Sequence, residues 1–441
     1  MARFLYTLLW WLALPLILAR LWLRGRQEPG YRQHWAERLG CYAARPKPHP
    51  GHSSPSHASE LTIWVHAVSV GETRASEPLI DALLAHYPAC HILLTHMTPT
   101  GRAAGKALYA KHGARLSQSY LPYDTPGMVR RFIEHHAPSM CILMETEVWP
   151  NLIAVCAAHK VPVALVNARL SARSLARAQR FGTLMMDAAR AITIVAAQTE
   201  MDAARMRSLG VAHVVVTGSI KFDVQVPAAA LLLGAALREH FGPRPVLLCA
   251  STRDGEEALI LDALQRCLSQ SETALPPDIL LVLVPRHPQR FNDVANLIAQ
   301  RGLRFARRSQ MIDADAVLAP NMDIVLGDSM GEMFAYYCAC DCAFIGGSLL
   351  PLGGQNLIEA CALGKPVLTG PHTFNFALVT SDAIAAGAAV CIADTDALFQ
   401  QAGRILREPN LQMDMAHHAL AFAAQHGGAT QRTLALLAPL I

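Results

Sequence analysis

Short apolar runs alternate with longer mixed stretches from residue 61 to the C-terminus. Most of these runs are continuously apolar, which is typical of strands that are covered on both faces of a sheet. The predicted strands span 61–68, 91–97, 140–144, 162–166, 192–196 and 213–217 in the first half, and 245–249, 279–284, 322–326, 340–345, 366–369 and 389–392 in the second. Because helical stretches separate the strands, we expect an α/β fold with a parallel, doubly wound, Rossmann-like sheet in each half.

The same pattern predicts how the chain is divided. A chain of 441 residues is too long for a single core. The stretch around 222–242 lacks a strand-like run and is the predicted junction. The predicted segments are a membrane anchor at 1–25, a basic and flexible linker at 26–60 that is rich in Pro, Ser and His from residue 43, a first Rossmann-like domain at 61–222, an interdomain linker at 223–243 and a second Rossmann-like domain at 244–441.

Residues 4–23 form a nearly unbroken apolar run, close to the ~20 residues that a helix needs to cross a bilayer. Arg20 and Pro15 interrupt the run, so a membrane span and a helix that lies in the interface both remain open. Arginines follow the run in greater number than they precede it, which predicts that the rest of the chain is cytoplasmic.

Composition narrows the possible ligands and the compartment. A net charge of +4 is too small to indicate nucleic-acid binding. The 11 cysteines follow no disulfide framework, which indicates a reducing compartment. Cys338, Cys340 and Cys342 alternate, so on a strand they would share one face. We expect a buried strand there in preference to a metal site, because cysteine packs as a small apolar residue.

The stretch 345–371, IGGSLLPLGGQNLIEACALGKPVLTGP, predicts a strand, a double-glycine loop, a short helix and a second strand. Such a loop leaves backbone N–H groups free beside a helix N-terminus, where an anion such as a phosphate is favoured. Glu359 lies one turn into the helix, within reach of ribose hydroxyls. Asn356 and Glu359 also have the spacing of a capping box, so a sugar-nucleotide site and simple helix capping both remain open.

Polar motifs follow nearly every predicted strand. They are SVGE, TPTGR, ETEVWPN, NARLSARS and GSIKFD in the first half, and ASTRDGEE, PRHPQR, GDSMGEM and GGSLLPLGG in the second. Ligands of open parallel sheets bind beyond the carboxyl ends of the strands. We therefore expect one shared site in a cleft between the two domains.

The first half carries the candidates for proton transfer and charge stabilisation. Glu72 begins a predicted helix, where the dipole favours an ionised carboxylate, and is the candidate base; a charge that only steadies the helix is the alternative. Glu145 and Glu147 both end an apolar strand, where a buried carboxylate needs a partner or a task. The sequence does not choose between them. Lys221 follows a Gly-Ser turn and offers a cation to phosphate or carboxylate oxygens.

The second half carries candidates for binding an anion. Arg286 and His287 open PRHPQR at a strand end, with solvated surface charge as the alternative. Met330, Gly331 and Glu332 begin another predicted helix and offer backbone N–H groups, with ordinary helix initiation as the alternative.

Recognised cofactor and metal motifs are missing from the sequence in any useful context. Asp313 and Asp315 have the spacing of a DxD metal motif but fall in an irregular stretch. We therefore expect neither a cofactor nor a metal in the chemistry.

In this order, HAVSVGE, TPTG, LPYD, METEVWPN, NARLSARS, VTGSIKFD, VPRHPQRF, GDSMGEM, GGSLLPLGGQN and GPHTFNF closely resemble motifs of the 3-deoxy-D-manno-octulosonate (Kdo) transferases, glycosyltransferase family 30. These enzymes act in lipopolysaccharide assembly in Gram-negative bacteria, and the resemblance covers almost the whole chain. It implies an inverting, metal-independent GT-B enzyme, anchored to the cytoplasmic face of the inner membrane. It also implies transfer of Kdo from CMP-Kdo to the lipid A precursor lipid IVA, with the acceptor bound by the first domain and the CMP-sugar by the second.

The resemblance implies roles for single residues as well. The position that matches Glu72 is the proton acceptor, and those that match Glu145 and Lys221 stabilise the transition state. The positions implied in CMP binding are Arg286, His287, Met330, Gly331, Glu332, Asn356, Leu357, Ile358 and Glu359. Gln355 departs from the family, in which His often precedes the Asn, so a cationic role at this position is in doubt.

Three alternatives remain open from the sequence alone. Another membrane-associated GT-B transferase would use a UDP-sugar and a lipid acceptor. A sugar-nucleotide epimerase of similar shape would need neither the N-terminal anchor nor an acceptor. A tethered nucleotide-binding scaffold would not need Glu72.

Overall fold

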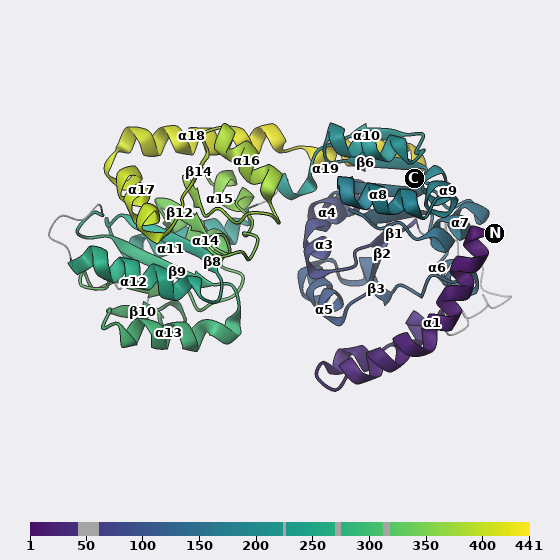
Figure 1. Ribbon diagram of the computed structural model, residues 1–441, viewed down its shortest axis with the longest axis horizontal. Helices are drawn as coiled ribbons and strands as arrows, with labels where there is room; N and C mark the ends of the chain where they lie inside the picture. The colour runs from purple at the N-terminus through teal and green to yellow at the C-terminus, as the bar shows by residue number, and fades with distance from the viewer. Residues whose placement is uncertain (43–60, 224–225, 270–274, 312–317) are drawn as a thin grey trace. The chain divides into compact units, whose positions relative to one another are not determined.

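The computed structural model describes residues 1–42, 61–223, 226–269, 275–311 and 318–441. The chain forms two compact units, shown in Figure 1. Unit 1 comprises Met1–Asp223 and Gly427–Ile441, and unit 2 comprises Val224–His426. The predicted α/β class with two doubly wound sheets is confirmed, whereas a shared cleft between them stays a prediction.

Unit 1 contains a parallel sheet of seven strands in the order β3-β2-β1-β4-β5-β6-β7. The strands are β1 (Thr62–His66), β2 (His91–His96), β3 (Leu116–Tyr120), β4 (Met140–Met144), β5 (Val163–Ala168), β6 (Ile194–Ala197) and β7 (Val214–Val216). The helices are α1 (Ala2–Arg24), η1 (Pro29–Arg32), α2 (Trp35–Arg38), α3 (Val70–Ala75), α4 (Glu77–His86), α5 (Pro99–Leu108), η2 (Ala110–Arg115), α6 (Pro126–His136), α7 (Pro150–Ala158), α8 (Ala172–Arg180), α9 (Thr183–Arg190), α10 (Glu200–Ser208), η3 (Ile220–Phe222), α19 (Ala429–Leu437) and η6 (Ala438–Leu440).

Unit 2 contains a second parallel seven-stranded sheet, in the order β10-β11-β9-β8-β12-β13-β14. The strands are β8 (Val246–Thr252), β9 (Leu280–Pro285), β10 (Phe305–Arg307), β11 (Ile324–Leu326), β12 (Cys342–Ile345), β13 (Val367–Thr369) and β14 (Ala389–Cys391). The helices are α11 (Ala228–Phe241), α12 (Glu256–Ser269), η4 (Pro288–Arg290), α13 (Phe291–Gln300), η5 (Arg308–Gln310), α14 (Met333–Ala339), α15 (Ile358–Ala362), α16 (Ala377–Ala385), α17 (Thr395–Arg407) and α18 (Pro409–His426).

Strand β1 shows why the apolar runs are continuous. Ile63 and Val65 belong to one buried cluster, whereas Trp64 belongs to another. Neighbouring side chains on a strand point to opposite faces, so both faces of the sheet are covered. Each predicted strand coincides with an observed one, but two edge strands, β3 and β10, were not predicted. Strand β3 (LSQSY) is mostly polar and β10 (FAR) is short, so neither forms an apolar run.

The structure moves two domain boundaries. Helix α19 belongs to unit 1, where Leu434 and Leu437 pack in the cluster that contains Ile63 and Val65. The predicted second domain at 244–441 therefore extends too far. Within the predicted interdomain linker at 223–243, α11 buries Leu237 and belongs to unit 2. The unit to which α11 and α19 each belong could not be predicted, because the sequence of an apolar helix does not indicate which hydrophobic core the helix packs in.

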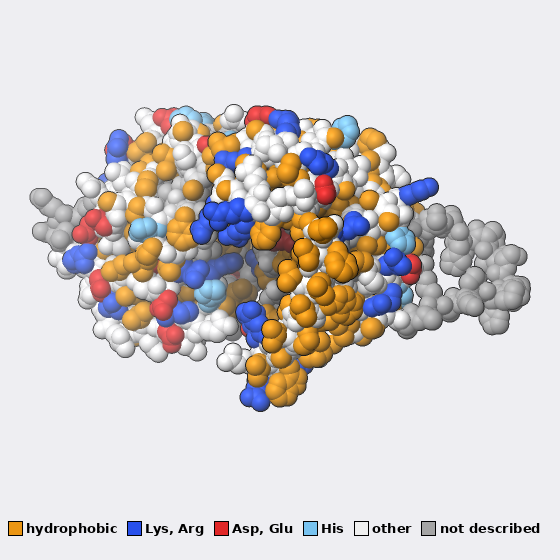
Figure 2. All heavy atoms as spheres, turned by 45° about the vertical axis from the view of Figure 1, so that its right-hand side comes forward, with side chains coloured by type: hydrophobic (Ala, Val, Ile, Leu, Met, Phe, Trp, Pro, Cys, Tyr) orange, Lys and Arg blue, Asp and Glu red, His pale blue; other side chains and the backbone are white. Residues whose placement is uncertain are grey.

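Helix α1 packs along unit 1 instead of projecting from it. The Tyr6 hydroxyl donates to Asp124 at 2.8 Å, and Leu14 is buried with Tyr123 and Met128. The other side of α1 is exposed and apolar, and Figure 2 shows hydrophobic side chains gathered over the part of the surface that carries it. Among the described residues, α1 is the one helix that is long and apolar enough to cross a membrane.

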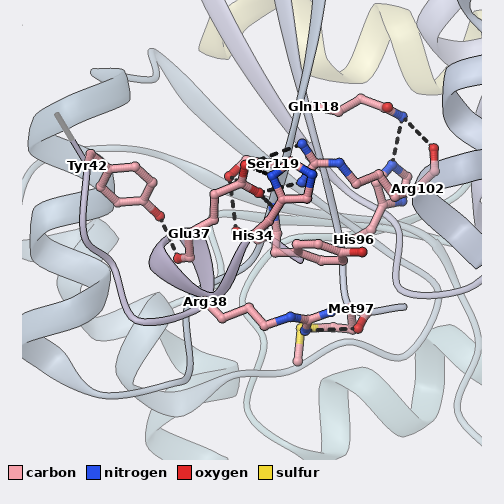
Figure 3. A network of polar contacts seen from close by, with 10 residues as sticks. His34, Glu37, Arg38, Tyr42, His96, Met97, Arg102, Gln118 and Ser119 are labelled. Carbon is pink, nitrogen blue, oxygen red and sulfur yellow. Dashed lines mark hydrogen bonds and ion pairs between the residues drawn. The ribbon is translucent and has the colours of Figure 1, made fainter. Parts of the chain in front are cut away.

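The predicted flexible linker at 26–60 is wrong for its first part. Glu37 pairs with Arg102, as Figure 3 shows. It also accepts a hydrogen bond from the backbone N–H of Tyr120 at 2.8 Å. The buried Arg38 guanidinium donates to the carbonyl of Met97 at 3.1 Å and lies 3.7 Å from the centre of the Tyr120 ring. These contacts hold the segment against β2 and β3. Residues 43–60 of this predicted linker lie outside the described residues.

Candidate functional site

Glu72 lies in the first turn of α3, directly after β1. Ser69 caps this helix, and the Glu72 carboxylate accepts a hydrogen bond from the backbone N–H of Val68 at 2.6 Å. Burial raises the pKa of Glu72 to about 7, and the charges of Glu147 and Glu145 add to the rise, whereas the Val68 hydrogen bond opposes it. The dipole of this six-residue helix therefore does not hold the pKa of Glu72 at its ordinary value, because burial outweighs it, and the role of Glu72 as an ionised base stays a prediction.

Glu145 and Lys221 form an ion pair at the carboxyl end of the same sheet. The Lys221 Nζ lies 2.8 Å from the Glu145 Oε1, and the two side chains are 36% and 20% exposed. Glu145 has a left-handed backbone with φ of 58°, which is uncommon for residues other than glycine. Backbone hydrogen bonds hold it there, from its own N–H to Val166 and from the N–H of Arg169 to its carbonyl.

The structure separates Glu145 from Glu147, which the sequence could not do. Glu147 accepts a hydrogen bond from the Trp149 indole at 2.8 Å, whereas Glu145 has the cationic partner. Burial raises the pKa of Glu147, and the charge of Glu145 adds to the rise. Because the charges of both residues act on Glu72, unit 1 brings the three carboxylates and Lys221 into one group.

Unit 2 gathers positive charge at the end of β9. Arg286 and His287 are exposed and follow this strand directly. Partial shielding of the imidazole from solvent lowers the pKa of His287, and the charges of Arg253 and Arg286 lower it further, so the three side chains lie close together. A neutral imidazole flanked by two guanidinium groups suits an anionic ligand that also needs a hydrogen-bond donor or acceptor.

Asn356 and Glu359 are joined by direct contacts. Asn356 accepts a hydrogen bond from the backbone N–H of Ile358 at 3.1 Å and donates to the Glu359 carboxylate at 3.2 Å. Burial raises the pKa of Tyr337, with the charge of Glu359 adding to the rise and that of Arg286 opposing it. The charges of Arg286 and Glu359 both act on the Tyr337 hydroxyl, so these two predicted ligand residues lie near the same side chain.

Leu357 and Ile358 can reach a ligand only through their backbone, because both side chains are buried. Helix α15, which they begin, is only five residues long. Its dipole is correspondingly small, and the predicted binding of a phosphate at this helix N-terminus stays a prediction.

The double-glycine loop differs from prediction in one respect. The N–H groups of Gly347 and Leu349 donate to the Glu256 carboxylate at 2.6 and 2.9 Å, and that of Arg253 donates at 2.9 Å. These loop N–H groups are therefore not free for an anion. Gly347 has φ of 71°, a left-handed conformation that requires little strain only in glycine. Glu256 is fully buried and shapes the loop.

Glu256 was not predicted from the sequence. The available signal was a carboxylate in ASTRDGEE directly after an apolar strand. The partner loop lies far along the chain, and nothing in either segment predicts the other.

Met330, Gly331 and Glu332 lead into α14, which begins at Met333 with Glu332 as its N-cap residue, so the predicted helix starts slightly later than expected. Glu332 pairs with Arg308 at 3.0 Å and accepts a hydrogen bond from Ser329 at 2.6 Å. Met330 is exposed. These contacts fix the loop, and its role in ligand binding stays a prediction.

The three alternating cysteines do not share a strand. Cys338 lies in α14, and Cys342 begins β12, with Cys340 between them. The predicted strand at 340–345 thus begins later than expected. Within the described ranges, no group of three or more His, Cys, Asp or Glu side chains could hold a metal ion. Asp313 and Asp315 lie outside those ranges.

Comparisons with known proteins agree with the motif resemblance. The family model described as 3-deoxy-D-manno-octulosonic-acid transferase matches residues 33–224. The 3-deoxy-D-manno-octulosonic acid transferase of Bordetella pertussis is 45% identical, over 98% of this chain and 98% of that protein. The enzyme of that name from Haemophilus influenzae is 36% identical, over 100% of this chain and 99% of that protein.

A solved structure extends the comparison to the fold. The UDP-GlcNAc 2-epimerase from Neisseria meningitidis, bound to UDP-GlcNAc, matches with a TM-score of 0.56 and 15% identity, covering 86% of this chain and 100% of that one. At this identity the likeness concerns the fold alone, and it supports the GT-B class.

Proposed function

Because the chain belongs to the family of 3-deoxy-D-manno-octulosonic acid (Kdo) transferases, we propose that it transfers Kdo from CMP-Kdo to lipid IVA. The coarser activity, Kdo transfer in lipopolysaccharide synthesis, follows from family membership. The donor, the acceptor and the stereochemistry form the proposal.

The observation that carries the mechanism is the group that Glu72 forms with Glu145, Glu147 and the Lys221 ion pair at the carboxyl end of one sheet, where burial and the neighbouring charges raise the pKa of Glu72 to about 7. A base whose pKa lies near the working pH can both accept a proton from the acceptor and release it afterwards. Glu72 takes the proton of the acceptor hydroxyl while the oxygen of that hydroxyl forms a bond to the anomeric carbon of Kdo. The bond from that carbon to the phosphate oxygen breaks, and CMP leaves with the electron pair.

The Lys221–Glu145 pair suits the stabilisation of charge near the reacting carbon. Its ammonium group matches the carboxylate of Kdo, and its carboxylate favours positive charge that develops at the anomeric carbon. Because Glu145 is ion-paired, we assign it a stabilising role and not that of a nucleophile. A single displacement with one base inverts the configuration, which supports the inverting class.

The donor carries a phosphodiester and a carboxylate, and unit 2 offers Arg253, Arg286 and His287 to such an anion. Guanidinium groups can stabilise the departing phosphate, a task that a metal ion performs in other transferases. We therefore propose a metal-independent reaction. Asn356 and Glu359 are the residues proposed to bind the nucleoside.

We also propose that α1 holds the enzyme at the cytoplasmic face of the inner membrane. Phe4, Leu12 and Leu16 expose 71%, 66% and 75% of their surface, although each is apolar. The acceptor has fatty acyl chains, so an enzyme at the membrane surface meets it there. The packing of α1 along unit 1 favours an interfacial position over a free-standing span.

The test is incubation of the purified full-length protein with CMP-Kdo and lipid IVA, followed by mass spectrometry of the lipid. We expect a lipid product heavier by one or more Kdo residues, and inhibition by CMP but not by UDP. A lipid of unchanged mass, or inhibition by UDP alone, would contradict the proposal and favour a UDP-sugar transferase.

A further inference from the structure

Asn167 lies at the carboxyl end of β5, beside β4, the strand that Glu145 follows directly. Its backbone is left-handed, with φ of 53°. In the described part of the chain, six residues other than glycine have a positive φ, and Glu145 and Asn167 follow or end adjacent strands of one sheet. A positive φ is uncommon in residues other than glycine, and such residues concentrate at functional sites, so the occurrence of two on adjacent strands points to a role beyond packing.

The Asn167 side chain is tied to the segment that carries Lys221. Its Oδ1 accepts a hydrogen bond from the backbone N–H of Ile220 at 3.2 Å, and its carbonyl accepts one from Gln198 at 2.9 Å. Ile220 begins the short η3 helix and Lys221 follows it directly. Loss of this acceptor would release the N–H that starts the turn bearing the lysine.

Glu145, the other member of the ion pair, is held by the backbone on either side of Asn167. The residue before Asn167, Val166, accepts a hydrogen bond from the N–H of Glu145, and Arg169 donates to the Glu145 carbonyl. The backbone around Asn167 thus fixes Glu145, while the Asn167 side chain fixes the neighbour of Lys221. The segment 166–169 therefore positions both residues of the ion pair, in which the Lys221 Nζ lies 2.8 Å from the Glu145 carboxylate.

The Nδ2 of Asn167 shows that packing alone does not explain an asparagine at this position. Asn167 is fully buried, yet its Nδ2 has no hydrogen-bond partner among the residues that the structure describes. A buried donor without a partner is destabilising, and an apolar residue would avoid it. Asparagine combines the oxygen acceptor with tolerance of the left-handed backbone, and apolar residues lack both properties.

We propose that Asn167 is a positioning residue of the transferase: it sets the geometry of the Lys221–Glu145 ion pair through the N–H of Ile220. The proposal rests on the proposed function of that ion pair. Asn167 touches neither substrate nor reacting atoms in this role.

The test compares Asn167→Gly, which keeps the left-handed backbone and loses the acceptor, with Asn167→Asp, which keeps an acceptor oxygen. We expect N167G to lower kcat by about 10- to 100-fold, because small misplacements of catalytic groups have effects of this size. The KM for CMP-Kdo should stay within about twofold, and N167D should retain clearly more activity than N167G. Lys160→Gly is the matched control, since Lys160 has the same left-handed backbone (φ of 58°) at an exposed site and should keep wild-type activity.

A double variant separates positioning from general structural damage. If Asn167 acts through Lys221, N167G/K221A should be no slower than K221A alone, within about twofold. Multiplied losses would overturn the proposal, as would equal losses in N167G and N167D. An inactive wild type would contradict the proposed function instead. The positioning role has an independent readout, the NMR shift of ¹³C-dimethylated Lys221, which should move in N167G and not in K160G.

Discussion

The two units use carboxylates at the ends of their strands in opposite ways. In unit 1, burial together with the like charges of Glu147 and Glu145 raises the pKa of Glu72 to about 7. In unit 2, the Glu256 carboxylate accepts three backbone hydrogen bonds, from Arg253, Gly347 and Leu349, and is fully buried. The first arrangement favours proton transfer, and the second favours a fixed loop.

The difference teaches that one sheet architecture can serve chemistry or binding according to how its strand-end carboxylates are satisfied. A carboxylate with few donors and charged neighbours is poised to exchange a proton. A carboxylate that accepts hydrogen bonds from three backbone N–H groups fixes the conformation of the loop that carries them. We therefore expect substitutions in unit 1 to change kcat, and substitutions in unit 2 to change the affinity for the donor.

The largest effect is expected for Glu72→Gln. Loss of the base should lower kcat by about 10²- to 10⁴-fold, whereas the affinity for CMP should stay unchanged. Initial rates with CMP-Kdo and lipid IVA, together with calorimetric titration of CMP, measure both. Glu77→Gln is the control, because Glu77 lies in the next helix and pairs with Lys111 on the surface. Activity of E72Q within tenfold of the wild type would remove Glu72 from the role of base.

Lys221→Met is expected to have the next largest effect. The methionine keeps most of the side-chain volume and removes the charge that pairs with Glu145. Removal of one electrostatic stabiliser should lower kcat by about 10²-fold, with little change in the melting temperature because Lys221 is partly exposed. Lys111→Met removes a comparable surface ion pair and should be neutral. An equal loss in both variants would assign the effect to surface charge in general.

Glu256→Gln tests the other side of the comparison. The amide keeps one acceptor oxygen and leaves at least one of the three backbone donors without a partner, which should cost about 1–3 kcal/mol of unfolding free energy. The KM for CMP-Kdo should rise about tenfold while kcat stays within a few-fold. Denaturant unfolding and steady-state kinetics give the two numbers.

Glu257→Gln provides the matched control for this experiment. Glu257 is equally buried, but it bonds to the side chains of Thr252 and Arg290 and not to the backbone N–H groups of the glycine loop. We expect it to lose stability without a change in donor KM. A rise in KM in both variants would mean that general loosening of unit 2, and not the loop, governs donor binding.

The parts of the molecule that the sequence predicts are those that depend on neighbours along the chain. Continuous apolar runs identify β1 and β4, and the residues that follow them, Glu72 and Glu145, lie at the predicted edge of the sheet. Strand β3 was not predicted because its polar side chains lie at the edge of the sheet, where no apolar run is needed.

Long-range contacts explain the remaining failures. The choice of Glu145 over Glu147 depends on Lys221, which arrives from a distant segment. The Gly347 N–H is not free for an anion because it donates a hydrogen bond to Glu256, which lies far away in the sequence. Helix α19 joins unit 1 because Leu437 packs in the core of that unit. Neither the pKa of Glu72 nor its direction could be predicted, because burial and distant charges determine it.

The smallest and most discriminating effect is expected in the pH dependence. The base must be ionised, and burial together with the charges of Glu147 and Glu145 raises the pKa of Glu72 to about 7, so kcat/KM should fall as the pH falls through about 7. Glu147→Gln removes one negative neighbour, which favours the ionised form of Glu72 and should move the acidic limb to lower pH. Asp187→Asn, an exposed charge of the same unit, should leave the limb in place. A limb that E147Q moves to higher pH, or does not move, would show that the two carboxylates are not coupled. The assignment of proton transfer to unit 1 would then lose its electrostatic basis.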